Sequence, residues 1–294
     1  SACLVGSEMC IRDRPINMEE ILLLKGALII LIPLSLLRLI LQGLRFFFLT
    51  RALSGKKLPI FQCIGIRASS EFVALSLPSY VGGEVIRIIY LKEKGLPFNF
   101  SSSIVLIEVM MDILPGYTLA FLAGILALIR GKTLIGSTIL ILTSLFTSLY
   151  LSILFLIKKR WVPKILIKFL PNFEGNFQIN RKLLLPSIFS LILVLLSSFL
   201  LYYPSNLINK SLSFSDSMLA IYASLIMGSI SIGGAGLTEL GLYFYLKDVL
   251  NLNSWELVIL WRIISYHLIV LVSGLILSLW AIRKIPIKNY FRKV

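Results

Sequence analysis

The chain of 294 residues is 57% hydrophobic and only 15% charged, and its mean hydropathy is +0.92. A globular domain carries about 25% charged residues, so this composition excludes a soluble enzyme, a secreted disulfide scaffold and a disordered chain. It predicts an all-α polytopic integral membrane protein. The net charge is +15, from 29 basic and 14 acidic residues. We expect the excess basic residues to lie in loops that face anionic lipid, and therefore expect membrane lipids and no nucleic acid as partners.

The first stretch, 1–14, differs from the rest of the chain. It contains no long apolar run and no signal-peptide order of basic, apolar and small residues. It resembles a translated adapter sequence of the kind found at the edge of environmental gene fragments, so we expect the membrane domain to cover 15–294 and the native N-terminus to be missing. Cys3 and Cys10 fall within this stretch, which leaves Cys63 alone and predicts no disulfide framework, no metal site and no cofactor.

Five apolar stretches are long enough to cross a bilayer as helices, which takes about 20 residues. They cover about 21–49, 100–129, 133–157, 183–203 and 254–282. Two further apolar stretches, 60–90 and 216–249, are broken near their middles, at 77–83 and 231–236. Each flank would form only roughly 20–25 Å of helix, short of the ~30 Å hydrocarbon core. The sequence therefore predicts about five full spans and two re-entrant helical hairpins, which amount to seven or eight transmembrane segments.

Basic residues are distributed unevenly between the two sets of loops. Eighteen lysines and arginines fall in one set of loops and in the C-terminal tail. The opposite loops carry only Arg130, Lys132, Lys210 and Lys247. Because cytoplasmic loops are enriched in Lys and Arg, this asymmetry predicts a cytoplasmic C-terminus and a place in the cell (inner) membrane.

The predicted topology contains an internal repeat. In the half at about 21–129, an inward span is followed by a hairpin from the inside and by an outward span. In the half at about 183–282, the same elements occur with opposite polarity, and span 133–157 links the two halves. Inverted repeats with interrupted helices near the midplane are a recurring transporter design. The alternative interpretation is a coincidence of hydropathy.

Eight of the charged residues within the predicted membrane segments are the most informative. They are Arg67, Glu71, Glu84, Arg87, Glu108, Asp112, Glu239 and Arg262. At ~2.5–3.5 kcal/mol each, eight charges facing lipid would cost on the order of 20 kcal/mol. We therefore expect these residues to pair with one another or to line a wet cavity.

The spacing of the charges in the first hairpin predicts two pairs. Arg67 and Glu71 are four residues apart, and Glu84 and Arg87 are three apart, so each pair shares one face of a helix. For Glu84 and Arg87, a helix-capping pair at the cytoplasmic interface is the alternative.

Two carboxylates of like charge stand four residues apart in the span that follows, at Glu108 and Asp112. Such a pair needs a cation between its members or a proton on one of them. Our hypothesis is that Arg262, in the equivalent span of the other half, supplies the counter-charge. Arg38 and Arg45 are interpreted instead as side chains that snorkel toward the inner face.

Glycines interrupt both hairpins, at Gly82 and Gly83 in the first and at Gly233, Gly234 and Gly236 in the second. A carboxylate follows each break, Glu84 in one case and Glu239 in the other. This arrangement favours helix N-termini that point inward, which are ready sites for anions. The alternative is that the glycines only allow close packing of helices.

Four motifs occur in order along the chain: Gln42–Phe46 with an arginine before an aromatic residue, Leu77–Arg87 with Leu-Pro and Gly-Gly-Glu, Glu108–Asp112, and Gly233–Glu239 followed by Trp261, Arg262 and Tyr266. Together they resemble the transmembrane, flippase-like region of lysylphosphatidylglycerol synthases over about 35–282. Val109 departs from that pattern, because the family usually has arginine there, so Glu108 is expected to need another partner. The sequence has no counterpart of the soluble synthase domain, so the resemblance does not imply aminoacyl transfer.

The resemblance implies a lipid flippase, which moves an anionic or head-group-modified lipid between leaflets and is not an enzyme. The implied substrate-binding residues are Arg67, Glu71, Gly82, Gly83, Glu84, Arg87, Glu108, Asp112, Gly233, Gly234, Gly236, Glu239, Arg262 and Tyr266. Arg87 and Arg262 are expected to bind the phosphate.

Two other functions stay open. One is a membrane enzyme of polyprenyl-phosphate sugar or lipid head-group transfer, although the sequence contains no Walker loop, dinucleotide fingerprint or metal-ligand spacing. The other is a non-catalytic partner subunit of a lipid-modifying enzyme. A homo-oligomer is compatible with each of the three functions.

Overall fold

The computed structural model describes residues 18–77, 82–158, 183–208, 212–231 and 234–284. Within these ranges the secondary structure is entirely helical, and no strand occurs. Five helices in this part of the chain are long and apolar enough to cross a membrane: Lys25–Ser54, Phe98–Ile129, Thr133–Ser152, Leu184–Leu207 and Trp255–Leu279. The prediction of an all-helical polytopic membrane protein is confirmed at this level, while the adapter-like stretch 1–14 lies outside the described residues.

The helices follow the predicted order. They are α1 (Met18–Ser54), α2 (Ile60–Ser76), α3 (Gly83–Glu93), α4 (Phe98–Ile129), α5 (Thr133–Lys158), α7 (Leu184–Leu207), α8 (Phe214–Gly228), α9 (Leu237–Phe244), α10 (Trp255–Arg262) and α11 (Leu268–Lys284). A π-helical turn at Tyr245–Val249 extends α9, and a second one at Ile263–His267 joins α10 to α11. Single π-turns within α-helices occur frequently at functional sites.

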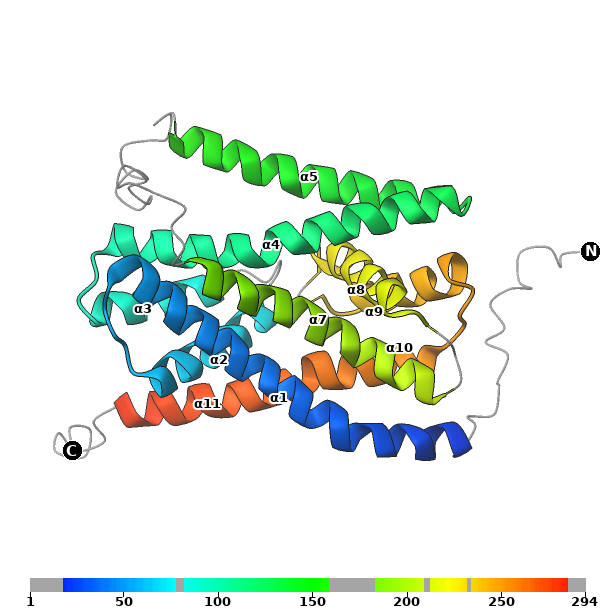
Figure 1. The fold of residues 1–294 in the computed structure, drawn as a ribbon, viewed down its shortest axis with the longest axis horizontal. Helices are drawn as coiled ribbons and strands as arrows, with labels where there is room; N and C mark the ends of the chain where they lie inside the picture. The colour runs from blue at the N-terminus through cyan, green and yellow to red at the C-terminus, as the bar shows by residue number, and fades with distance from the viewer. Residues whose placement is uncertain (1–17, 78–81, 159–182, 209–211, 232–233, 285–294) are drawn as a thin grey trace, which may run out of the picture.

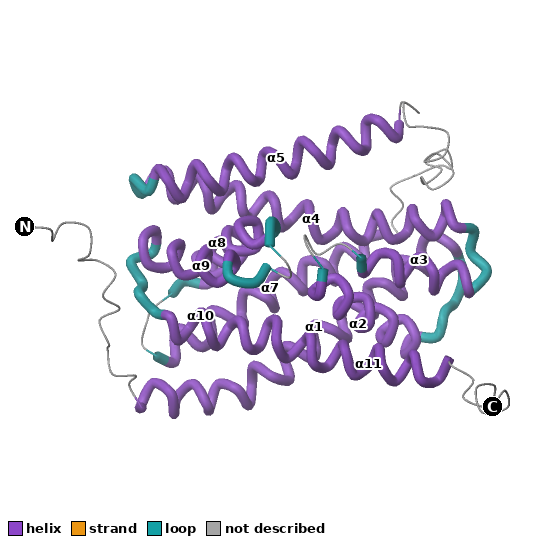
Figure 2. The backbone as a smooth tube through the Cα atoms, turned by 180° about the vertical axis from the view of Figure 1, so that it is seen from behind, coloured by secondary structure: helices purple, strands orange, loops and turns teal. Residues whose placement is uncertain are grey.

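The long helices run along one axis of the molecule, as Figure 1 shows for α1, α4, α5, α7 and the α10–α11 pair. The shorter helices α2 and α3 contact each other and lie toward one end of this bundle, and α8 and α9 contact each other toward the opposite end (Figures 1 and 2). The two broken stretches of the sequence therefore occupy opposite ends of the molecule.

Glycines with positive φ allow the chain to turn between the short helices. Gly82, directly before α3, has a φ of 125°, and Gly236, directly before α9, has a φ of 79°. Residues with a Cβ rarely adopt these conformations. Gly82 and Gly236, one in each break, are thus needed by the backbone itself.

Close packing accounts for another glycine of the first break. A Cβ on Gly83 would clash with the backbone carbonyl oxygen of Ser70 in α2, so only glycine lets α3 approach α2 this closely. The alternative interpretation of the glycines as packing positions is therefore correct for Gly83. The same device joins α4 to α5, because a Cβ on Gly124 would lie 2.8 Å from Leu140 Cγ.

The buried apolar side chains form two main clusters, one drawn from both halves of the chain and the other from the first half. One cluster surrounds α8 and includes Ile221, Tyr245 and Trp261, and the other surrounds α2 and α3 and includes Ile66 and Leu91. Many apolar side chains point outward instead, as is expected of helices that face acyl chains.

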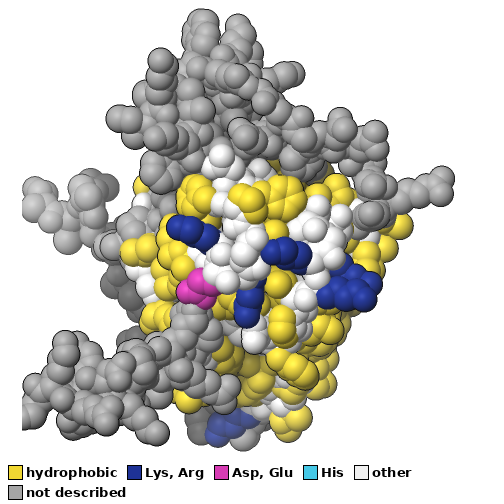
Figure 3. Space-filling model, turned by 90° about the vertical axis from the view of Figure 1, so that its left-hand side faces the viewer, with side chains coloured by type: hydrophobic (Ala, Val, Ile, Leu, Met, Phe, Trp, Pro, Cys, Tyr) yellow, Lys and Arg dark blue, Asp and Glu magenta, His cyan; other side chains and the backbone are white. Residues whose placement is uncertain are grey.

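One end of the bundle is basic. The loop from α1 to α2 and the loop from α3 to α4 both lie at this end (Figure 1), which carries Arg51, Lys56, Lys57, Lys92 and Lys94. Figure 3 shows Lys and Arg side chains grouped on this face. Lys56 Nζ holds the two loops together, since it donates to the carbonyl oxygens of Lys94 (3.0 Å) and Gly95 (2.8 Å). The basic stretch 159–182 and the tail 285–294 lie outside the described residues.

Candidate functional site

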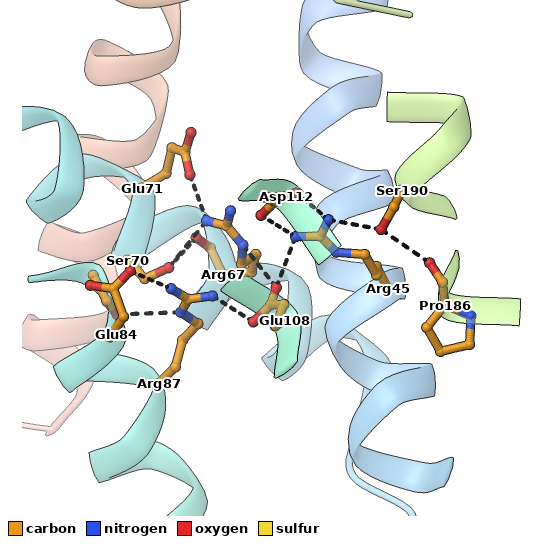
Figure 4. Close-up of polar contacts among 11 residues, drawn as sticks. Arg45, Arg67, Ser70, Glu71, Glu84, Arg87, Glu108, Asp112, Pro186 and Ser190 are labelled. Atoms are coloured by element: carbon orange, nitrogen blue, oxygen red, sulfur yellow. Dashed lines mark hydrogen bonds and ion pairs between the residues drawn. The ribbon is translucent and has the colours of Figure 1, made fainter. Parts of the chain in front are cut away.

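Glu108 of α4 lies at the centre of the polar site, and its side chain has no exposed surface. It accepts hydrogen bonds from Arg45 Nη2 (3.3 Å), Arg67 Nε (3.2 Å) and Arg87 Nη1 (2.5 Å), as Figure 4 shows. The three arginines belong to α1, α2 and α3. One buried carboxylate therefore joins three helices to a fourth. Because position 109 is valine, Glu108 was expected to need another partner, and the three arginines from other helices are these partners.

The two pairs predicted within the first hairpin are both present. Arg67 Nη1 donates to Glu71 Oε2 at 2.5 Å, and Arg87 Nη2 donates to Glu84 Oε1 at 3.1 Å. Glu84 also accepts the backbone N–H of Gly82 at 2.9 Å, so it caps the start of α3 as well as pairing with an arginine. Glu84 thus caps the helix and pairs with Arg87 at the same time, and a position of this pair at the cytoplasmic interface stays a prediction.

Arg45 is completely buried, which shows that its interpretation as a snorkelling side chain was wrong. Its guanidinium binds both carboxylate oxygens of Asp112, with Nη2 to Oδ2 at 2.7 Å, and Nη1 also donates to Ser190 Oγ in α7 at 3.2 Å. Two parallel bonds to one carboxylate are the geometry that guanidinium groups favour. Arg45 therefore holds α1 against both α4 and α7.

Arg262 pairs with Glu239 and not with the carboxylates of α4. Its Nε lies 2.7 Å from Glu239 Oε1, and its guanidinium carbon lies 3.8 Å from the centre of the Tyr266 ring. The hypothesis that Arg262 supplies the counter-charge of Glu108 and Asp112 is therefore wrong. The physical reason is that Arg45, Arg67 and Arg87, which lie in the same half of the chain as these carboxylates, already pair with them.

Tyr266 links the two halves. It lies in the π-turn between α10 and α11, and its hydroxyl donates to the carbonyl oxygen of Leu75, near the end of α2, at 3.1 Å. A helix end leaves carbonyl groups without partners in the helix, and this contact satisfies one of them. The break of the first hairpin is thus fastened to the last long helix.

A cavity of about 870 Å³ lies between the two halves. Its ionisable lining consists of Arg38, Arg67, Glu71, Glu84, Arg87, Asp112 and Arg262, with the tyrosines Tyr117, Tyr150, Tyr222 and Tyr266. Its apolar lining includes Leu106, Val109, Leu193, Val194, Ile221 and Leu225. The volume falls within the range of roughly 300–1,000 Å³ that is typical of small-molecule sites. The cavity is amphiphilic, because arginines and carboxylates share it with leucine, isoleucine and valine.

The structure brings most of the proposed binding residues to this cavity. Its lining includes Arg67, Glu71, Gly82, Glu84, Arg87, Asp112, Arg262 and Tyr266. The other members of the set support these residues or lie apart: Glu108 contacts the arginines, Glu239 contacts Arg262, Gly83 packs on α2, and Gly234 and Gly236 shape the turn before α9. Gly233 lies outside the described residues.

Sequence reasoning did not place the polar stripe of α1 in the site, because it interpreted Arg38 and Arg45 as side chains that snorkel and used Gln42 only as part of a family motif. Arg38 and Gln42 line the cavity, and Arg45 belongs to the ion-pair network. These three residues are separated by four and three positions, which places them on one face of a helix. That spacing on a span otherwise rich in leucine and isoleucine was the signal that could have identified them. The parts of the chain that the structure describes contain no group of three or more His, Cys, Asp or Glu side chains that could hold a metal ion.

The fold and the cavity define a multi-pass membrane protein with an arginine-rich, amphiphilic internal site. The family model for the lysylphosphatidylglycerol synthase TM region matches residues 19–274, and the chain belongs to this family. Neither the curated proteins nor the solved structures include a significant match to the chain.

Proposed function

We propose that this protein moves a phosphate-bearing lipid, anionic or modified at its head group, between the two leaflets of the membrane. The observation that carries the proposal is one cavity lined by charged and by apolar side chains from both halves of the chain. A lipid has the same two requirements, since its head group needs hydrogen bonds and its acyl chains need apolar contact. Membership of a family named for a lipid synthase supports a lipid substrate.

In this proposal α2 with α3, and α8 with α9, are re-entrant hairpins that enter the membrane from opposite faces. Helices of 17 and 11 residues, as in α2 and α3, extend roughly 25 and 16 Å, which is short of the ~30 Å hydrocarbon core. Their position at opposite ends of the bundle (Figure 2) supports an inverted repeat of 21–129 and 183–282. The substrate site then lies where the two repeats meet, as in other transporters of this design.

The ion pairs provide a way to bind and release a head group with little change in local charge. Arg67, Arg87 and Arg262 each face the cavity and each bind a carboxylate of the protein. Pairing offsets much of the free energy needed to bury a guanidinium group. A phosphate has the bidentate geometry that arginine prefers, so it can replace such a carboxylate on the guanidinium. When the lipid leaves, the carboxylate returns.

We also propose that the basic end of the bundle, with the C-terminus, faces the cytoplasm. The five basic residues at this end support this orientation, because anionic lipid head groups attract Lys and Arg on the cytoplasmic side. Lipids of the cell membrane are then available as substrates on both sides of the site.

The test is lipid flipping in proteoliposomes. Fluorescent phosphatidylglycerol would be placed in both leaflets, and dithionite added outside would bleach only the molecules that reach the outer leaflet. Wild-type protein is expected to make nearly all of the label accessible. Arg87→Ala and Arg262→Ala are expected to slow this exchange, whereas Lys132→Ala, at an exposed loop position, should behave like the wild type.

Protein-free vesicles and heat-denatured protein provide the background. If the folded wild type does not exceed that background with any phospholipid, the flippase proposal is wrong. Transfer of a sugar or head group to a lipid by the same preparation would then identify the chain as an enzyme. Equal rates for the wild type and both arginine variants would show that the cavity is not the route.

A further inference from the structure

Arg38 differs from the other arginines of the site. Arg45, Arg67, Arg87 and Arg262 each lie within 4 Å of a carboxylate oxygen. Among the residues that the structure describes, Arg38 has no such partner, and its Nε is buried without a hydrogen bond. It lines the cavity all the same. Arg38 therefore brings a positive charge to the cavity that no carboxylate balances within bonding distance.

The position of Arg38 is held by the last long helix and not by an anion. Its Nη2 donates to the carbonyl oxygen of Ser265 at 3.2 Å, and Ser35 Oγ, one turn earlier on α1, donates to the carbonyl oxygen of Ile264 at 2.9 Å. Both carbonyl groups belong to the π-turn at Ile263–His267. A carbonyl oxygen is a neutral acceptor, so this contact orients the guanidinium without forming an ion pair.

Gln42 lies one helical turn after Arg38 and shares the cavity with it. Its Oε1 is also buried without a hydrogen-bond partner in the described part of the chain. Each buried polar group without a partner costs about 1–3 kcal/mol, and more when it is charged. Two neighbouring groups of this kind, one a cationic donor and the other an acceptor, point to a ligand that carries the complementary groups.

We infer that Arg38 is the primary anchor for the phosphodiester of the transported lipid, and that Gln42 accepts a hydrogen bond from a hydroxyl or ammonium group of the same head group. The inference rests on the proposed function and names the residue that selects the substrate. A phosphate at Arg67, Arg87 or Arg262 replaces a carboxylate that is already bound, so the charge balance hardly changes. At Arg38 it neutralises a cation that has no carboxylate, which makes this the most favourable position for an added anion.

The experiment measures lipid binding separately from flipping. The full chain, purified in detergent, is titrated with phosphatidylglycerol or with diacylglycerol of the same acyl chains, and bound lipid is counted by native mass spectrometry. We expect Arg38→Gln to weaken phosphatidylglycerol binding by about tenfold, the effect of one lost charge-assisted hydrogen bond, and to leave diacylglycerol binding unchanged. Gln42→Leu should weaken phosphatidylglycerol binding by a few-fold. Arg51→Gln is the matched control, because Arg51 is exposed on the same helix.

Two further arms keep the inference falsifiable if Arg38→Gln does not fold. In the wild type, phosphatidylglycerol must bind more tightly than diacylglycerol, and equal binding overturns the inference. Glycerol 3-phosphate, a soluble phosphate ester, is not expected to displace the lipid. Displacement at millimolar concentration would show that the site takes a free organophosphate and would overturn the lipid assignment.

The two proposals fail in different ways. If the wild type flips lipid but Arg38→Gln retains phosphatidylglycerol as the wild type does, the anchor is wrong and the flippase proposal stands. If phosphatidylglycerol binding depends on Arg38 but no lipid is flipped, the anchor stands and the flippase proposal is wrong.

Discussion

Replacement of Glu108 by glutamine tests whether the buried carboxylate holds the first half of the molecule together. The change keeps the size of the side chain and one acceptor oxygen but removes the negative charge. Three guanidinium groups, those of Arg45, Arg67 and Arg87, then surround a neutral amide. We expect a large loss of stability, because helices α1, α2 and α3 all contact α4 through this one group.

The magnitude follows from the contacts. Three hydrogen bonds between ionised groups, at about 1.5–3 kcal/mol each, set an upper limit of roughly 5–9 kcal/mol. The loss should be smaller because each arginine keeps a second carboxylate: Asp112 on Arg45, Glu71 on Arg67 and Glu84 on Arg87. Breaking a buried ion pair costs about 3–5 kcal/mol. At about 2–4 °C per kcal/mol for a chain of this order of size, the Tm should fall by on the order of 10 °C.

Cys63 makes this change measurable. It is completely buried in α2, so a thiol-reactive fluorophore labels it only when the protein unfolds. Cys3 and Cys10 would be replaced by serine in every sample, so that Cys63 is the only thiol. The control is Asp248→Asn, since Asp248 makes no ion pair among the described residues and lies in the π-turn that extends α9, far along the chain from Glu108. A Tm for Glu108→Gln within about 2 °C of the control would refute the central role of the carboxylate.

Two further predictions concern packing and orientation. Gly83→Ala should lower the Tm by several degrees, because the added Cβ would meet the rigid carbonyl of Ser70 and overpacking costs about 1–3 kcal/mol. Gly26→Ala is the control and should not lower the Tm, because the space around its Cβ is open. Equal Tm values for the two variants in the thiol assay would contradict this prediction. For the orientation, Lys56→Cys and Lys132→Cys are made separately in the protein that lacks Cys3 and Cys10. The two new cysteines should react with a membrane-impermeant maleimide from opposite sides of the membrane, Lys56→Cys from the cytoplasmic side. Labelling of both from the same side would disprove the proposed orientation.

Pairs within one helix could be predicted from the sequence, whereas pairs between helices could not. Arg67 with Glu71 and Glu84 with Arg87 follow from the 3.6-residue period, and both form as expected. The partner of Asp112 was sought in the other half of the chain, but it is Arg45 of α1. Spacing along the chain shows that a buried carboxylate needs a cation, but it does not show which of several arginines folds against it.

Composition and hydropathy alone determined that this is an all-helical membrane protein, approximately where its long helices lie, and where two apolar stretches are interrupted. These properties depend on local rules, namely the free energy of placing each residue in hydrocarbon and the conformations open to glycine. Only the tertiary structure decided that the helices line an amphiphilic cavity and that Glu108 collects three arginines. It also decided that, among the described residues, Arg38 reaches this cavity without a carboxylate partner and Gln42 Oε1 without a hydrogen bond. Contacts between helices that are distant in the sequence depend on how their faces pack together, and the periodic pattern of residues within one helix does not determine that packing.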